Sequence, residues 1–116
     1  MYKPRNLTCF WCGRGLVSSR DASNPLRLTR DHFPARVNRR DFPFLPQCIV
    51  FACFECNNSR GTDDGWIPFA WYNAEQQERI LVEGTPAVLE FNNSNPAIRR
   101  ILSPELYQFI ADIERG

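Results

Sequence analysis

The sequence predicts a small α+β domain in which a two-stranded β-hairpin packs on a short helix, followed by a mostly helical C-terminal extension. Three observations lead to this fold class. Two Cys-x-x-Cys pairs stand 40 residues apart, two short apolar segments flank a proline-rich stretch, and the last segment repeats apolar residues at helical spacing. The 116 residues suffice for one ordinary domain. We therefore expect residues 1–62 to form a cysteine-stapled part and residues 63–116 to pack on it as an extension, giving a single compact domain overall.

The first part contains the expected hairpin and its helix. Residues 26–33 begin with alternating apolar and polar side chains, which is typical of a short strand that ends before a proline. Residues 34–47 are rich in proline and arginine and are predicted to be a loop. The apolar residues 48–52 fit the second strand. Residues 54–60 are predicted to form a short helix that ends at Gly61.

The extension contains two expected helices. Asn73 can cap a helix predicted to run through Leu81, and residues 87–91 are predicted to be a strand or an extended segment. Ser103 followed by Pro104 resembles a helix N-cap with proline at the first helical position. The apolar residues after it recur at 3, 4 and 7 residues, which predicts an amphipathic helix. They are Leu106, Phe109, Ile110 and Ile113.

Charge is unevenly distributed along the chain. Residues 1–61 include ten basic and four acidic residues, a net charge of +6, whereas residues 62–116 include four basic and nine acidic residues, a net charge of −5. The arginine-rich half favours a polyanion such as nucleic acid, because a guanidinium group can bind phosphate through two hydrogen bonds. A solvated surface without such a partner is the other interpretation.

The composition also bears on location. No run of about 18 apolar residues is present, so we expect no transmembrane helix and no membrane partner. The first residues lack the apolar stretch of a secretory signal. We therefore expect a cytoplasmic, reducing location, where paired cysteines bind metal more often than they form disulfides.

The two cysteine pairs predict a metal site. Cys9 and Cys12 form the first pair, and Cys53 and Cys56 form the second. Each two-residue spacer lets both thiolates point at one ion, and four thiolates complete the closed tetrahedral shell of structural Zn²⁺. A redox Cys-x-x-Cys motif is the first alternative, but no βαβ pattern surrounds either pair. Two disulfides are the second alternative, and the expected reducing location disfavours them. Cys48 is interpreted as a small buried apolar residue.

Three further residues suggest chemistry. Asp31 and His32 stand at the end of the first predicted strand, and Asn57 directly follows the last cysteine of the second pair. Strand pairing would bring Asn57 near Asp31. Carboxylate and amide oxygens suit a hard divalent ion such as Mg²⁺ or Mn²⁺, and His32 could act as a general base on water. Each residue also has a non-catalytic interpretation. His32 can be an ordinary surface or core imidazole, Asp31 can pair with Arg30, and Asn57 can cap the helix.

Taken together, these motifs resemble the zinc-containing HNH endonucleases. The resemblance rests on Cys9-x-x-Cys12, Asp31-His32-x-Pro34 and Cys53-x-x-Cys56-Asn57-x-x-Arg60-Gly61, and covers residues 9–61. It implies a ββα-metal core stapled by zinc and metal-dependent hydrolysis of phosphodiester bonds in DNA, with nicking as one outcome. Such a chain is compatible with a phage or mobile-element origin.

The resemblance also assigns roles to residues. Asp31 and Asn57 match the ligands of the catalytic divalent ion, His32 matches the general base, and Arg60 stands where the family usually has a lysine and should contact phosphate. The arginines that flank this site could grip the nucleic-acid backbone. They are Arg30, Arg36, Arg39 and Arg40.

One family position differs here. The family's middle asparagine, which braces the loop, corresponds to Cys48, and Gln47 or Asn38 could replace its hydrogen bond. Two non-catalytic alternatives therefore stay open. The first is a zinc module that binds nucleic acid through the arginine-rich half. The second is a protein partner or a homodimer contact in the C-terminal half, where residues 66–72 are strongly aromatic, although ordinary packing also explains these aromatics.

Overall fold

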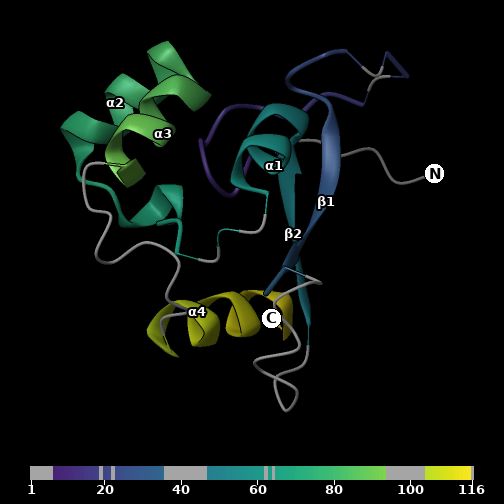
Figure 1. Ribbon diagram of the computed structural model, residues 1–116, viewed down its shortest axis with the longest axis vertical. Helices are drawn as coiled ribbons and strands as arrows, with labels where there is room; N and C mark the ends of the chain where they lie inside the picture. Colours follow the sequence, from purple (N-terminus) through teal and green to yellow (C-terminus); the bar gives the residue numbers. More distant parts are fainter. Residues whose placement is uncertain are drawn as a thin grey trace.

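The computed structural model describes residues 7–18, 20–21, 23–35, 47–61, 63, 65–93 and 104–115. Within these ranges the chain forms two strands, four α-helices and a short 3-10 helix, so the expected α+β class is confirmed (Figure 1). The elements are β1 (Leu28–Phe33), β2 (Cys48–Cys53), α1 (Phe54–Arg60), η2 (Phe69–Trp71), α2 (Ala74–Glu83), α3 (Thr85–Asn93) and α4 (Pro104–Arg115).

The two strands form the predicted antiparallel hairpin. In its register, Arg30 pairs with Phe51, Asp31 with Val50, and His32 with Ile49. Successive side chains of a strand point to opposite faces of the sheet. Asp31 and Val50 are accordingly buried, whereas Phe51, Ile49 and Arg30 are exposed on the other face.

Helix α1 follows β2 without a connecting loop and ends where the sequence predicts. Cys53 is its N-cap, and the Sγ atom of this residue accepts a hydrogen bond from the backbone N–H of Cys56. Gly61 closes the helix with φ of 55°, a backbone conformation that glycine adopts at little cost. The helix lies against the hairpin in Figure 1. Because α1 follows β2 directly, the end of β2 also sets the position of the first turn of α1.

The segment before β1, residues 7–16, forms a turn that we call the N-terminal knuckle. Backbone hydrogen bonds close it from Cys9 N–H to the Arg14 carbonyl and from Leu16 N–H to the Leu7 carbonyl. Gly13 has φ of 72°, and a Cβ atom there would lie 2.7 Å from the ring of Phe69. The knuckle therefore requires glycine both for its backbone and for its packing on η2.

The extension begins with helix α2, which starts after Asn73 as predicted and continues two residues beyond Leu81. Its N-terminus carries a capping box, in which the Asn73 side chain accepts from Gln76 N–H and the Gln76 side chain accepts from Asn73 N–H. Both halves of this motif satisfy N–H groups that have no partner inside the helix. The local signal was therefore sufficient to place the start of α2.

The expectation of a strand or extended segment at residues 87–91 was wrong, because these residues belong to helix α3. Thr85, Val88 and Asn92 are buried at positions i, i+3 and i+7, which is the spacing of one helical face. Pro86 lies in the first turn, where its fixed φ favours a helix. A short apolar run such as 87–91 fits either element until its neighbours are known.

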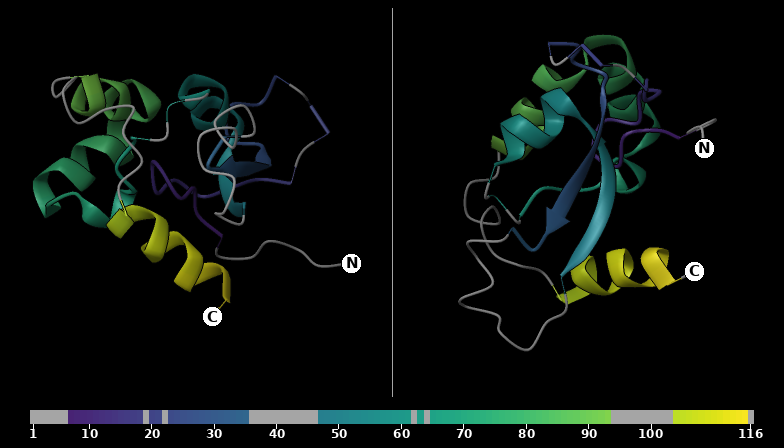
Figure 2. Two further views of the ribbon diagram at one scale, coloured as in Figure 1. Left: turned by 60° about the horizontal axis from the view of Figure 1, so that its bottom comes forward. Right: turned by 90° about the vertical axis from the view of Figure 1, so that its right-hand side faces the viewer.

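One hydrophobic core serves both parts of the chain. Trp11 and Phe33 come from the first part, and Trp66, Val88 and Ile110 come from the second; all are at most 2% exposed. Helix α3 packs on α1, and α4 packs on β2 (Figure 2). None of the described helices is long and apolar enough to cross a lipid bilayer.

Helix α4 begins at Pro104, as predicted, and turns Leu106 and Ile110 toward the core. Ser103, its expected cap, and most of the expected loop at residues 34–47 lie outside the described residues. The described ends of that loop are tied together by Gln47, whose side-chain N–H donates to the Pro34 carbonyl at 3.0 Å.

Candidate functional site

The four cysteines of the two pairs meet at one buried point of the fold. Cys9 and Cys12 come from the N-terminal knuckle, and Cys53 and Cys56 come from the junction of β2 with α1. Their Sγ atoms all lie within 4.8 Å of one another, and no disulfide joins them. The Cys12 and Cys53 sulfurs are 3.9 Å apart, near the ~3.8 Å edge of a tetrahedron with zinc–sulfur bonds of about 2.3 Å. The cluster can therefore hold a metal ion such as zinc in a closed shell.

Backbone N–H groups of the cysteine turns point at the sulfur atoms. The N–H groups of Trp11 and Cys12 donate to the Sγ atom of Cys9 at 3.4 and 3.5 Å, and the N–H of Cys56 donates to Cys53 at 3.3 Å. Hydrogen bonds of this kind favour the charged thiolate form that binds metal. The two-residue spacers thus supply both the ligands and the donors that stabilise them.

Arg14 and Thr85 complete the surroundings of the cluster, and neither contact is predictable from the cysteine motif. The Arg14 guanidinium donates to the Cys12 sulfur at 3.2 Å, to the Cys53 sulfur at 3.8 Å and to the Thr85 hydroxyl at 2.9 Å. It also pairs with Glu55 at 3.3 Å. The available signal was the sequence Cys12-Gly13-Arg14, which places this arginine two residues after a cysteine and within the knuckle.

The surroundings shift the pKa values of these thiols in different directions. Hydrogen bonds from Cys53, Cys56 and Cys9 lower the pKa of Cys12 well below its usual value, and the Arg14 guanidinium adds to this effect. Burial raises the pKa of Cys9. The Arg14 guanidinium therefore compensates negative charge at the Cys12 sulfur from outside the cluster, and a metal ion would compensate it from inside.

A second buried polar group centres on Asp31 of β1. Arg60 of α1 donates from Nε to Oδ2 at 2.9 Å and from Nη2 to Oδ1 at 2.7 Å, and the indole N–H of Trp11 donates to Oδ2 at 2.8 Å. The Arg60 and Asp31 side chains are only 1% and 3% exposed. Both carboxylate oxygens are thus hydrogen-bonded, and the negative charge is neutralised within the protein.

The position of Arg60 corrects one expectation. We predicted that this arginine contacts phosphate, but its guanidinium is buried and also donates to the carbonyls of His32 and Asp63, both at 2.8 Å. It lies over the rings of Trp11 and Phe33, with centroid distances of 5.1 and 5.7 Å. In this arrangement Arg60 is a core partner of the hairpin and not a surface contact.

Asn57 joins α1 to β1 next to this ion pair. Its side-chain N–H group donates to the Thr29 hydroxyl at 3.0 Å and to the Arg30 carbonyl at 3.4 Å. Asn57 and Arg60 are three residues apart on the helix and therefore share a face. The structure thus brings Asn57 and Asp31 to the same seam between α1 and β1, as expected.

A hard divalent ion between Asp31 and Asn57 does not fit this arrangement, although the donor types are suitable. The carboxylate oxygens already accept hydrogen bonds from Arg60 and Trp11. Mg²⁺ also keeps several water molecules in its shell, and a carboxylate that is 3% exposed is closed to them. The expected ion site is therefore filled by protein groups.

His32 lies on the opposite face of the hairpin from Asp31. Alternation along β1 places the half-buried His32 and the exposed Arg30 on one face, and their partners on β2 are Ile49 and Phe51. Ile49 and Phe51 are 38% and 39% exposed. We call these four residues the open hairpin face, since α1 covers the other side.

The remaining predicted residues have mixed outcomes. Arg36, Arg39 and Arg40 lie outside the described residues, as does Asn38. Cys48, which replaces the family's middle asparagine, is 5% exposed at the start of β2, as expected for a buried apolar residue.

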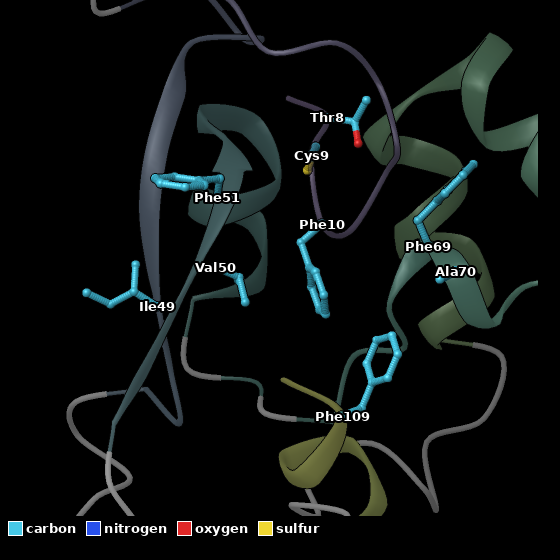
Figure 3. Close-up of a pocket in the computed structure, with 9 residues that line it drawn as sticks. All are labelled: Thr8, Cys9, Phe10, Ile49, Val50, Phe51, Phe69, Ala70 and Phe109. Carbon is cyan, nitrogen blue, oxygen red and sulfur yellow. The ribbon is translucent and has the colours of Figure 1, made fainter. Parts of the chain in front are cut away.

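An apolar groove of about 260 Å³ lies beside β2 (Figure 3). Phe10 of the knuckle and Phe109 of α4 point toward one another in it, with ring centroids 6.1 Å apart. Of the aromatic stretch at residues 66–72, Trp66 and Tyr72 are buried, whereas Trp71 is 44% exposed. Ordinary packing thus accounts for most of this stretch.

Comparison with models of known protein families, with curated proteins and with solved structures gave no match. The resemblance to HNH endonucleases accordingly rests on the motif residues themselves.

Proposed function

We propose that this chain is an HNH-type endonuclease that hydrolyses phosphodiester bonds in DNA, and that its four cysteines hold structural zinc. The observation that carries the proposal is the open hairpin face. There an imidazole and a guanidinium, His32 and Arg30, stand two residues apart on one strand, about 6.6 Å along it. The other face of that strand is fixed to α1 by Asn57 and Arg60. A rigid support of this kind suits groups that must be positioned for chemistry.

The proposed chemistry uses the residues of that face. His32 accepts a proton from a water molecule, the resulting hydroxide attacks phosphorus, and the bond to the leaving oxygen breaks. The leaving oxygen takes a proton from solvent. Arg30 stabilises the negative charge of the phosphate through hydrogen bonds. The net charge of +6 on residues 1–61 favours association with the polyanionic backbone of DNA.

A divalent ion would supply further stabilisation of the phosphate charge. The resemblance implies that Asp31 and Asn57 would hold it, but both Asp31 oxygens are engaged by Arg60 and Trp11. No step of the proposed chemistry is therefore assigned to an ion.

The test is the nicking of supercoiled plasmid with Mg²⁺, with Mn²⁺ and with EDTA. His32→Ala should lower the cleavage rate by roughly 10²- to 10⁴-fold, the usual contribution of a general base. The matched control is Ser59→Ala, an exposed position on α1 that takes no part in proton transfer. Cleavage by His32→Ala at the rate of the control would refute the assignment of the base.

The second candidate is a zinc module that binds nucleic acid without cutting it. It is favoured by the ion pair that closes Asp31 and by Cys48 at the family's asparagine position. Binding that persists in EDTA, weakens steeply between about 50 and 200 mM salt and produces no strand breaks would select this candidate.

A further inference from the structure

We infer that Arg60 is the resident cation of the Asp31 site and that it closes this site to divalent ions. The inference concerns a site that the proposed function also involves. It rests on the proposed function in one respect, namely that an HNH-type endonuclease would be expected to bind a divalent ion at Asp31. It assigns to the guanidinium the place that the metal takes in the resemblance.

Both oxygens of the Asp31 carboxylate already accept hydrogen bonds from protein groups. Asp31 receives two hydrogen bonds from Arg60 and one from Trp11, at 2.7 to 2.9 Å. An ion could bind only by displacing Arg60, because the two cations would otherwise share one buried carboxylate and repel each other.

Arg60 is also held from several sides. Besides Asp31, its guanidinium contacts the carbonyls of His32 and Asp63 and the rings of Trp11 and Phe33. These groups come from β1, the knuckle and the segment after α1. A guanidinium stays protonated across the accessible pH range, so a rise in pH does not remove its charge. The closure is therefore built into the fold.

The experiment follows two N–H groups that both donate to Oδ2 of Asp31. They are the indole N–H of Trp11 and the Nε–H of Arg60, whose NMR signals report directly on the carboxylate. The full-length protein, with its cysteine site loaded, is titrated with Mg²⁺ in the absence of DNA. In the unaltered protein neither signal should shift. A saturable shift of both signals would overturn the inference.

Variants test whether Arg60 is the group that closes the site. In Arg60→Met the buried carboxylate lacks its cation, so the Trp11 signal should shift and saturate with Mg²⁺, and the thermal midpoint should rise with Mg²⁺ because the ion binds the folded state. The double variant Asp31→Asn with Arg60→Met should show neither response. Arg20→Met, which removes an exposed arginine, should behave as the unaltered protein. An Arg60→Met protein that is insensitive to Mg²⁺ would refute the role of Arg60.

These measurements do not depend on cleavage. Loss of the proposed nuclease function would leave the Mg²⁺ response of Arg60→Met interpretable. Conversely, saturable Mg²⁺ binding at Asp31 in the unaltered protein would refute the closure and leave the nuclease proposal standing.

Discussion

Arg14 and Arg60 belong to the basic part of the chain, yet the guanidinium of each one interacts with a group of the protein itself. Arg14 donates to the sulfurs of Cys12 and Cys53, and Arg60 pairs with Asp31. Guanidinium suits both positions, because its planar array of donors can engage several acceptors at once. The net positive charge of residues 1–61 is therefore larger than the positive charge that a nucleic acid could contact.

Replacing Arg14 with alanine should weaken retention of the metal. The change removes the hydrogen bonds to two sulfurs and to Thr85. Loss of a hydrogen bond to a metal-ligating group typically lowers metal affinity by about 10- to 100-fold. We expect zinc to pass to a coloured chelator at least about tenfold faster than from the unaltered protein. Arg20→Ala, at an exposed position, is the control. Equal rates for the two variants would contradict a role for Arg14 at the cluster.

At the scale of elements, local signals explain the hairpin, α1 and the start of α2. Gly61 ends α1, and Asn73 caps α2 through reciprocal hydrogen bonds with Gln76. Helix α3 was not predicted, because its burial pattern depends on packing against α1 and α2. Its polar anchor is likewise non-local: the Asn92 side chain accepts from Ile67 N–H and donates to the Tyr72 hydroxyl.

Asn73→Ala should destabilise the protein by about 1 kcal/mol, the usual cost of losing a helix N-cap. The reason is that Gln76 N–H loses its acceptor at 2.8 Å. Urea denaturation should show a lower midpoint with an unchanged slope. Asn58→Ala, an exposed change within α1, should stay within about 0.5 kcal/mol. A cap variant as stable as this control would show that the capping box contributes nothing.

At the scale of the molecule, the four-cysteine cluster and the core connect both parts of the chain. The Thr85 hydroxyl at the start of α3 lies 3.1 Å from the Cys56 sulfur, and Trp11 packs edge-to-face on Trp66 at 6.0 Å. Contacts between residues that are far apart in sequence therefore hold the first part of the chain and the extension together.

Removing the metal with a chelator should unfold both parts in one transition, because metal-binding free energy is also folding free energy. Tryptophan fluorescence and far-ultraviolet circular dichroism should change together, and added zinc should restore both signals. Helical signal from α2 and α3 that survives after the tryptophan signal is lost would show that the extension is stable by itself.

From the sequence, the four-cysteine cluster and the proximity of Asn57 to Asp31 could be predicted more fully than the contacts made by Asp31. Cysteine spacing restricts geometry strongly, because a two-residue spacer lets both thiols of a pair point at one ion. Arginine is less informative, because Arg60 suits a phosphate and a carboxylate equally well. Only the fold shows that its partner, 29 residues earlier in the chain, is Asp31.

The distance between the cysteine pairs also has a consequence during synthesis. With 40 residues between the pairs and a ribosome adding about 5 to 20 residues per second, Cys9 and Cys12 emerge roughly two to nine seconds before Cys56. For that interval the nascent chain offers two thiols without their partners, open to oxidants and to competing ions. Assembly of the four-cysteine cluster therefore requires the first pair of thiols to stay reduced until the second pair has been synthesised.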